Sequence, residues 1–62
     1  MIFTASKIFG DLKLVGLNDN VSKSTLVRVS WDGEFQETIR VATNSPLEAV
    51  NIVAEQLMVE QL

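Results

Sequence analysis

The chain has 62 residues, a net charge of −3 and a hydrophobic fraction of 47%, and it contains neither Cys nor His. This length predicts one small domain over residues 1–62. The absence of Cys and His from the sequence excludes disulfides and the usual zinc ligands. A domain of this size buries only about 60% of the surface of its unfolded chain. The high apolar fraction therefore favours association, with itself or with a target.

Residues 1–17 hold two apolar runs on either side of Gly10 and Asp11. A Gly followed by a polar residue suits a two-residue type II′ turn, which would join these runs into a β-hairpin. The alternative is a short helix over residues 4–9 with Thr4 as its cap. The abundance of Ile, Phe, Val and Thr favours strands. The polar residues that follow, up to position 24, predict a loop.

Residues 25–31 and 35–42 alternate between apolar and polar side chains, which is typical of half-buried strands. Asp32 and Gly33 between them are typical of a two-residue type I′ loop. That loop would pair Ser30 with Phe35. It would also place the apolar faces of the two strands on opposite sides of the sheet.

A three-residue loop over residues 31–33 removes this conflict. It pairs Val29 with Phe35 and gives the two strands a common apolar face. It also places Gly33 at the loop position where a type I turn with a G1 bulge needs a positive φ. We therefore predict the longer loop, which would move Trp31 to a partly exposed position at the tip of the hairpin.

Residues 44–62 predict one amphipathic helix. Ser45 is a good N-cap, Pro46 suits the first helical position, and Glu48 completes a Ser-x-x-Glu capping box. The apolar stripe that should pack on the sheet consists of Leu47, Val50, Val53, Ala54, Leu57 and Met58. The expected fold class is α+β, a three- to four-stranded antiparallel β-meander with one C-terminal α-helix packed on one face.

The helix also supplies candidates for contact with a protein partner. Ile52 and Val59 lie together away from the core stripe, and packing them across a two-fold axis predicts a homodimer through the helix. The helix has acids but no base, so Glu48 and Glu55 could face a basic partner, although a merely solvated face is the commoner explanation. Trp31 either caps the core or acts as a binding hot spot, where Trp is enriched.

Nucleic acid is the alternative partner. Arg28 and Arg40 fall on the even-numbered, polar face of the predicted sheet, where they could hold a single strand. The pI of about 4.6 and the lack of a stacking aromatic side chain on that face argue against this function. A polar outer sheet face explains the same residues more simply.

Catalysis is not expected. Without His or Cys, an acid–base or nucleophilic site would need Asp, Glu, Lys or Ser, and no two of these stand at a spacing typical of a dyad. Glu34 and Glu37, three residues apart in a strand, should face opposite sides. We therefore expect no catalytic residue, no cofactor and no metal site. With no apolar run typical of a signal peptide or membrane span, we expect a cytoplasmic protein without membrane contact.

Val41 and Ala42, followed by a capped helix that contains Glu48 and Ala49, form a strand-to-helix junction common in small phage and bacterial proteins. Over the C-terminal half, this order resembles the layout of a short phage protein that inhibits bacterial RNA polymerase. The resemblance assigns a role to no residue. With the argument for association, it predicts a small non-enzymatic protein-binding module, such as a phage-type inhibitor or accessory factor that acts on a host protein.

Overall fold

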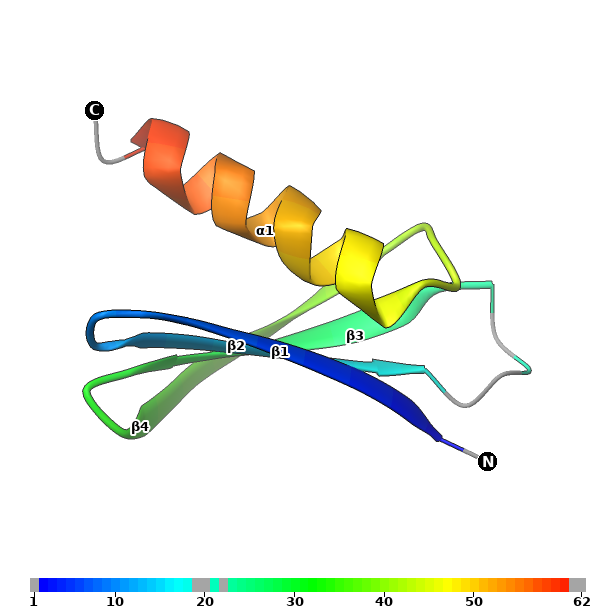
Figure 1. Cartoon of the computed structure of the whole chain (residues 1–62), viewed down its shortest axis with the longest axis horizontal. Coiled ribbons are helices and arrows are strands. Elements are labelled where there is room, and N and C mark those ends of the chain that lie inside the picture. Colours follow the sequence, from blue (N-terminus) through cyan, green and yellow to red (C-terminus); the bar gives the residue numbers. More distant parts are fainter. Residues whose placement is uncertain (1, 19–20, 22, 61–62) are drawn as a thin grey trace.

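The computed structural model describes residues 2–18, 21 and 23–60, and for residues 58–60 only the course of the backbone. Within these residues the chain forms one four-stranded antiparallel sheet in sequence order, with a C-terminal helix packed on one face (Figure 1). The elements are β1 (Phe3–Phe9), β2 (Leu12–Asn18), β3 (Thr25–Trp31), β4 (Glu34–Val41) and α1 (Pro46–Glu60). The predicted α+β meander is confirmed.

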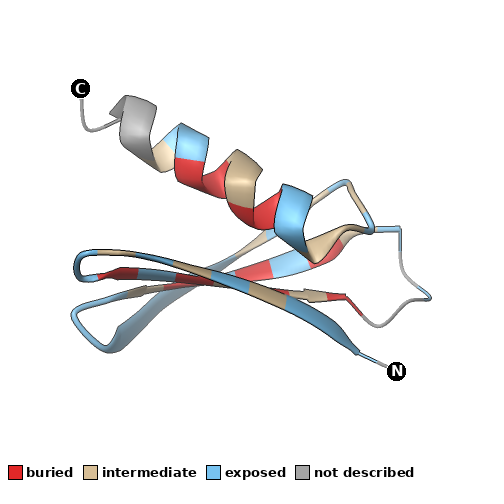
Figure 2. Ribbon diagram, viewed as in Figure 1, coloured by how far each residue is buried: buried red, intermediate tan, exposed pale blue. Residues whose placement is uncertain are grey.

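Helix α1 crosses the sheet obliquely over β1, β2 and β3 and barely reaches β4. We call the side of the sheet that carries α1 the inner face and the opposite side the outer face. Figure 2 shows the buried residues where the helix and the inner face meet. This core consists of Leu12, Leu14, Val27 and Val29 from the sheet and Ala49, Val50, Val53 and Ala54 from the helix.

The β1–β2 connection confirms the predicted hairpin and excludes the alternative helix over residues 4–9. Of the two turn residues, Gly10 has a φ of 60° and Asp11 does not have a positive φ, as a type II′ turn requires. The strands then pair without interruption from Phe9 opposite Leu12 to Phe3 opposite Asn18. Composition and turn chemistry therefore sufficed to predict this part of the fold.

Gly16, in the middle of β2, allows α1 to approach the sheet closely. A Cβ atom at this position would lie 2.9 Å from the carbonyl oxygen of Pro46 and 2.9 Å from Cγ2 of Val50. Both distances are too short for non-bonded carbon contacts, so any larger residue would displace the first turn of the helix. Gly16 thus sets where the helix begins over the sheet.

The core stripe of α1 is rotated from the predicted one. Leu47, predicted to be buried, is 55% exposed, whereas Ala49 is fully buried. The contact with Gly16 turns Pro46 toward the sheet, and Leu47 lies about 100° further around the helix. Val50, Val53 and Ala54 are buried as predicted. The side chain of Met58 lies outside the described residues.

The start of α1 confirms Ser45 as the N-cap. The backbone N–H of Glu48 donates to the Ser45 Oγ (3.3 Å), and Ala49 N–H donates to the Ser45 carbonyl (2.9 Å). The carboxylate of Glu48 accepts a hydrogen bond from the hydroxyl of Thr43 (3.5 Å), which in turn accepts from Ser45 N–H (3.2 Å). Thr43 therefore stands between the two residues of the predicted capping box.

The β3–β4 turn contradicts the predicted three-residue loop. Asp32 and Gly33 have φ values of 51° and 81°, and two successive positive values define a type I′ turn. Ser30 lies opposite Phe35 and Trp31 opposite Glu34. The positive φ of Gly33 is confirmed, but Trp31 is the last residue of β3 and not a loop residue.

A β-bulge in β4 resolves the conflict that the longer loop was meant to remove. Val29 pairs with Glu37 while Ser30 pairs with Phe35, so Gln36 is the extra residue. Beyond the bulge, the odd-numbered residues of β4 face inward, as the odd-numbered residues of β3 do. Before the bulge, Phe35 lies on the outer face beside Ser30, which contradicts its predicted place on the common apolar face.

The close approach at Gly16 generates a first prediction. We expect Gly16→Ala to lower the free energy of unfolding by about 1–3 kcal/mol, because the added methyl group overlaps a backbone oxygen that cannot rotate away. Chemical denaturation followed by circular dichroism measures this. Adding Val50→Ala should restore little of the loss, since the overlap with Pro46 remains. An unchanged unfolding midpoint for Gly16→Ala would contradict the close approach.

The N-cap generates a second prediction. We expect Ser45→Ala to lower the free energy of unfolding by about 0.5–2 kcal/mol, because it leaves the Glu48 N–H without its acceptor. Ser45→Asp, which retains an acceptor, serves as the matched control and should unfold close to the parent. Equal losses for both variants would show that the hydroxyl of Ser45 does not act as a cap.

Candidate binding surface

The outer face of the sheet is a continuous surface that α1 leaves uncovered. The strand register and the alternation of side chains place its members, with the bulge taken into account. They are Thr4, Ser6 and Ile8 from β1, Lys13, Val15 and Leu17 from β2, Leu26, Arg28 and Ser30 from β3, and Phe35, Thr38 and Arg40 from β4. Three of these residues are basic, and none is acidic.

The acids of β4 lie on the other side of the sheet. Glu34 pairs with Trp31 and Glu37 with Val29, so both belong to the inner face. Their predicted placement on opposite sides is wrong, because the bulge at Gln36 adds one residue between them. The result is a segregation of charge. In a chain with a net charge of −3, the charged side chains that the described strands place on the outer face are all positive.

Exposed apolar side chains accompany the basic ones. Ile8 is 68% exposed and Phe35 is 52% exposed, and Leu26 is also exposed. Val15 and Leu17 are half-buried between them. Leu17 lies directly opposite Leu26, and Val15 lies opposite Arg28, so the apolar and basic groups are interleaved across the strands. A mixed patch of this kind is typical of a surface that another molecule covers.

Phe35 and Arg28 form a preassembled pair on this surface. The Arg28 guanidinium carbon lies 5.0 Å from the centre of the Phe35 ring, within the range of a cation–π contact. The pair exists because the two-residue turn places Phe35 opposite Ser30, on the outer face. The sequence prediction missed Phe35 as a surface residue, although Asp-Gly, the strongest signal for a two-residue hairpin, pointed to the register that places it there.

The structure divides the residues predicted for binding between two surfaces. Arg28 and Arg40 lie on the outer face, as predicted from their even positions, and Arg40 Nη1 donates to Ser24 Oγ (3.5 Å). Trp31 lies on the inner side, between Leu12 and Glu34 in the register, and is 37% exposed. Its predicted position at the loop tip is therefore wrong, although its partial exposure is confirmed.

The helix candidates lie on the opposite side of the molecule from the outer face. Glu48 and Glu55 are exposed, whereas Ile52 is half-buried. Val59 belongs to α1, but its side chain lies outside the described residues. The proposed contact of Ile52 and Val59 with a symmetry mate is thus neither confirmed nor contradicted.

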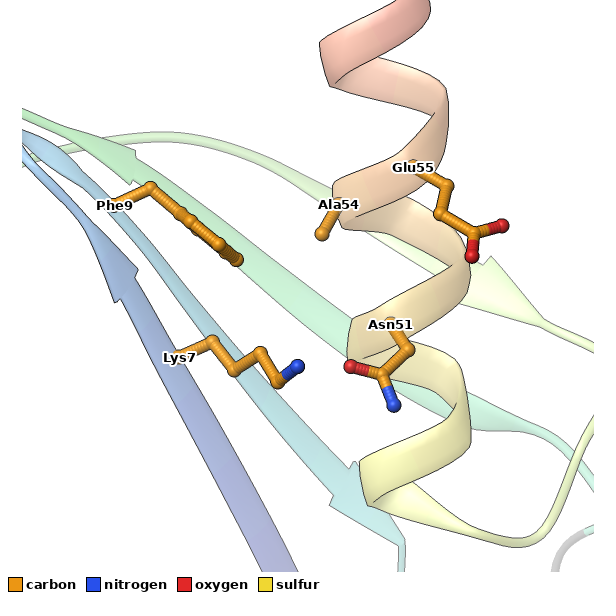
Figure 3. Close-up of a pocket in the computed structure, with 5 residues that line it drawn as sticks. All are labelled: Lys7, Phe9, Asn51, Ala54 and Glu55. Carbon is orange, nitrogen blue, oxygen red and sulfur yellow. The ribbon is translucent and has the colours of Figure 1, made fainter.

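A shallow cavity of about 390 Å³ lies between β1 and α1. It is lined by Lys7, Phe9, Asn51, Ala54 and Glu55 (Figure 3). Lys7 extends from the edge strand toward Asn51, and the ring of Phe9 lies beside Ala54. These groups offer an ammonium, an amide and a carboxylate to a polar ligand, but no pair of carboxylates or nucleophile with its base.

Within the described part of the chain, no three His, Cys, Asp or Glu side chains lie close enough to share a metal ion. In the described part of the chain, no helix is both long enough and apolar enough to cross a membrane. No protein-family model, curated protein or solved structure matches this chain.

Proposed function

We propose that this chain is a small non-enzymatic protein-binding module, and that its outer face binds an acidic and partly apolar segment of another protein. The observation that carries the proposal is the charge segregation across the sheet. Lys13, Arg28 and Arg40 share the outer face with exposed apolar side chains, and the described strands place no acid there. A segment with acidic and apolar side chains would complement both features of this surface.

The composition of the patch supports a protein partner. Its apolar members are mostly aliphatic, namely Ile8, Val15, Leu17 and Leu26, and aliphatic side chains pack well against other aliphatic side chains. Arg and large aromatic side chains dominate binding energies at protein interfaces. Arg28 and Phe35 already lie in contact, and a contact made before binding reduces the conformational entropy that binding has to remove.

We propose that the module acts in the cytoplasm on a host protein, as a phage-type inhibitor or accessory factor. The support is the resemblance of the strand-to-helix junction around Val41 and Glu48 to small phage proteins. A homodimer through the helix stays a prediction. Because Ile52 is half-buried, this side chain offers a second copy less exposed surface than the sequence suggested.

Single-stranded nucleic acid is the second candidate, and Phe35 is the observation in its favour. The sequence argument against it, that this face lacks an aromatic side chain, does not hold once Phe35 is exposed beside Arg28. Aromatic rings and basic groups together form platforms for bases and phosphates. We rank it second because Phe35 is the one aromatic ring that the described residues place on this face.

A peptide selection tests the proposal. We expect the purified chain, used as bait against a surface-displayed library of random peptides, to enrich sequences that combine Asp or Glu with apolar residues. Arg28→Glu/Arg40→Glu should bind the selected peptides at least about tenfold more weakly, because it reverses the charge of the surface. Glu48→Lys/Glu55→Lys is the matched control on the helix and should bind them as the parent does.

Two results would contradict the protein-binding proposal. One is that the outer-face variant binds the selected peptides as well as the parent. The other is that no peptide is enriched while the parent binds oligothymidylate with an affinity that falls steeply with salt. Each phosphate contact contributes about −0.7 to the slope of log K against log salt for a single strand, so contacts from both arginines predict a slope of about −1.4 or steeper. That outcome would favour the second candidate.

A further inference from the structure

The two edges of the sheet differ in how they are protected. The strand order leaves β1 and β4 at the edges, where backbone N–H and C=O groups lack a neighbouring strand. β4 is interrupted by its bulge and carries the charged residues Glu34, Glu37 and Arg40. β1 pairs regularly along all 7 of its residues, has no Pro, and carries Lys7 as its single charge. β1 is therefore the edge that is open to another strand.

The hairpin turn determines which groups of β1 point outward. In a two-residue turn, the carbonyl of the first residue accepts from the N–H of the fourth, so Phe9 and Leu12 form a hydrogen-bonded pair. Hydrogen-bonded residues alternate along an antiparallel pair. Residues Phe3, Ala5, Lys7 and Phe9 therefore use their backbone groups toward β2. Thr4, Ser6 and Ile8 present theirs at the free edge.

We propose that β1 pairs with β1 of a second copy, antiparallel and centred on Ser6. In this register Ser6 lies opposite Ser6 of the second copy, and Thr4 lies opposite Ile8. Each backbone group at the free edge of one β1 then faces such a group of the other β1, and all 7 residues of β1 are paired. The two four-stranded sheets become one continuous sheet.

The side chains are complementary in the same register. On the inner face, Phe3 of each copy lies opposite Phe9 of the other, at the cavity shown in Figure 3. On the outer face, Ile8, which is 68% exposed, gains Thr4 as its neighbour. Lys7 lies opposite Ala5. Two neighbouring registers would also satisfy the backbone, but one, centred on Ala5, pairs only residues 3–7 of β1, and the other, centred on Lys7, pairs only residues 5–9. The register centred on Lys7 also places Lys7 opposite Lys7, and like charges in that position are destabilising.

This self-complementarity favours a second copy over a foreign strand. A two-fold axis through Ser6 matches the exposed aromatic residue at one end of β1, Phe3, with the half-buried one at the other end, Phe9. Because the axis is perpendicular to the sheet, both helices lie on one side and both outer faces on the other. The dimer would thus present the basic and apolar surface twice on one side of the sheet.

Cysteine cross-linking tests the register directly, since the parent chain has no Cys. We expect Ser6→Cys to form a covalent dimer with a short bis-methanethiosulfonate reagent, because the two positions lie about 5.5 Å apart between Cα atoms. Thr4→Cys and Ile8→Cys are matched controls on the same exposed face. In each control the two cysteines lie four residues apart along the strands, about 13 Å, and should react at least tenfold more slowly.

Sedimentation supplies a second readout that does not need the reagent. Ser6→Lys should raise the dissociation constant of the dimer at least tenfold by placing two ammonium groups opposite each other. Thr38→Lys on the other edge strand and Ile52→Glu on the helix should leave it unchanged. The proposal is overturned if the three cysteine variants cross-link at equal rates, if the parent is monomeric at high micromolar concentration, or if Ile52→Glu alone separates the dimer.

Discussion

The architecture depends on side-chain parity in the second hairpin. Side chains of a strand alternate between two faces, so one additional residue reverses the side of everything beyond it. The Asp32–Gly33 turn takes the type I′ geometry that matches the twist of its strands, which forces Ser30 opposite Phe35. Without a correction, Ile39 and Val41 would point away from the core. Gln36 supplies the correction as a bulge, which lies beyond Phe35 and therefore leaves Phe35 on the outer face.

The bulge also sorts the charges. It brings Glu37 to the inner side, where the turn already places Glu34, near the rim that α1 barely reaches. It also keeps Arg40 on the outer face with Arg28, and the described strand residues of this face include no acid. The helix leaves the inner side of β4 largely uncovered. It packs closely on β2 instead, where Gly16 leaves room for Pro46 and Val50. The molecule thus closes one face with its helix and leaves the other as a basic and apolar surface.

Local signals sufficed to predict the elements. The hairpin at Gly10 and the helix start at Ser45 follow from a few neighbouring residues, and both are confirmed. The long-range geometry was not predicted, because parity can be restored either by a longer loop or by a bulge, and only the second exposes Phe35. A helical wheel likewise defines a face but not its rotation. Gly inside a strand often marks a close approach, and Gly16 could have indicated why Leu47 is exposed.

Nuclear Overhauser effects from Phe35 test the central claim most directly, since they report its face and its register together. Ser30 and Phe35 follow the hydrogen-bonded pair that closes the turn, so they form a non-hydrogen-bonded pair with close Cα atoms. The account predicts a strong contact between the Hα atoms of Ser30 and Phe35, and contacts from the Phe35 ring to the Arg28 side chain. Contacts from that ring to the methyl groups of Val50 or Val53, with Val29 opposite Phe35, would contradict it.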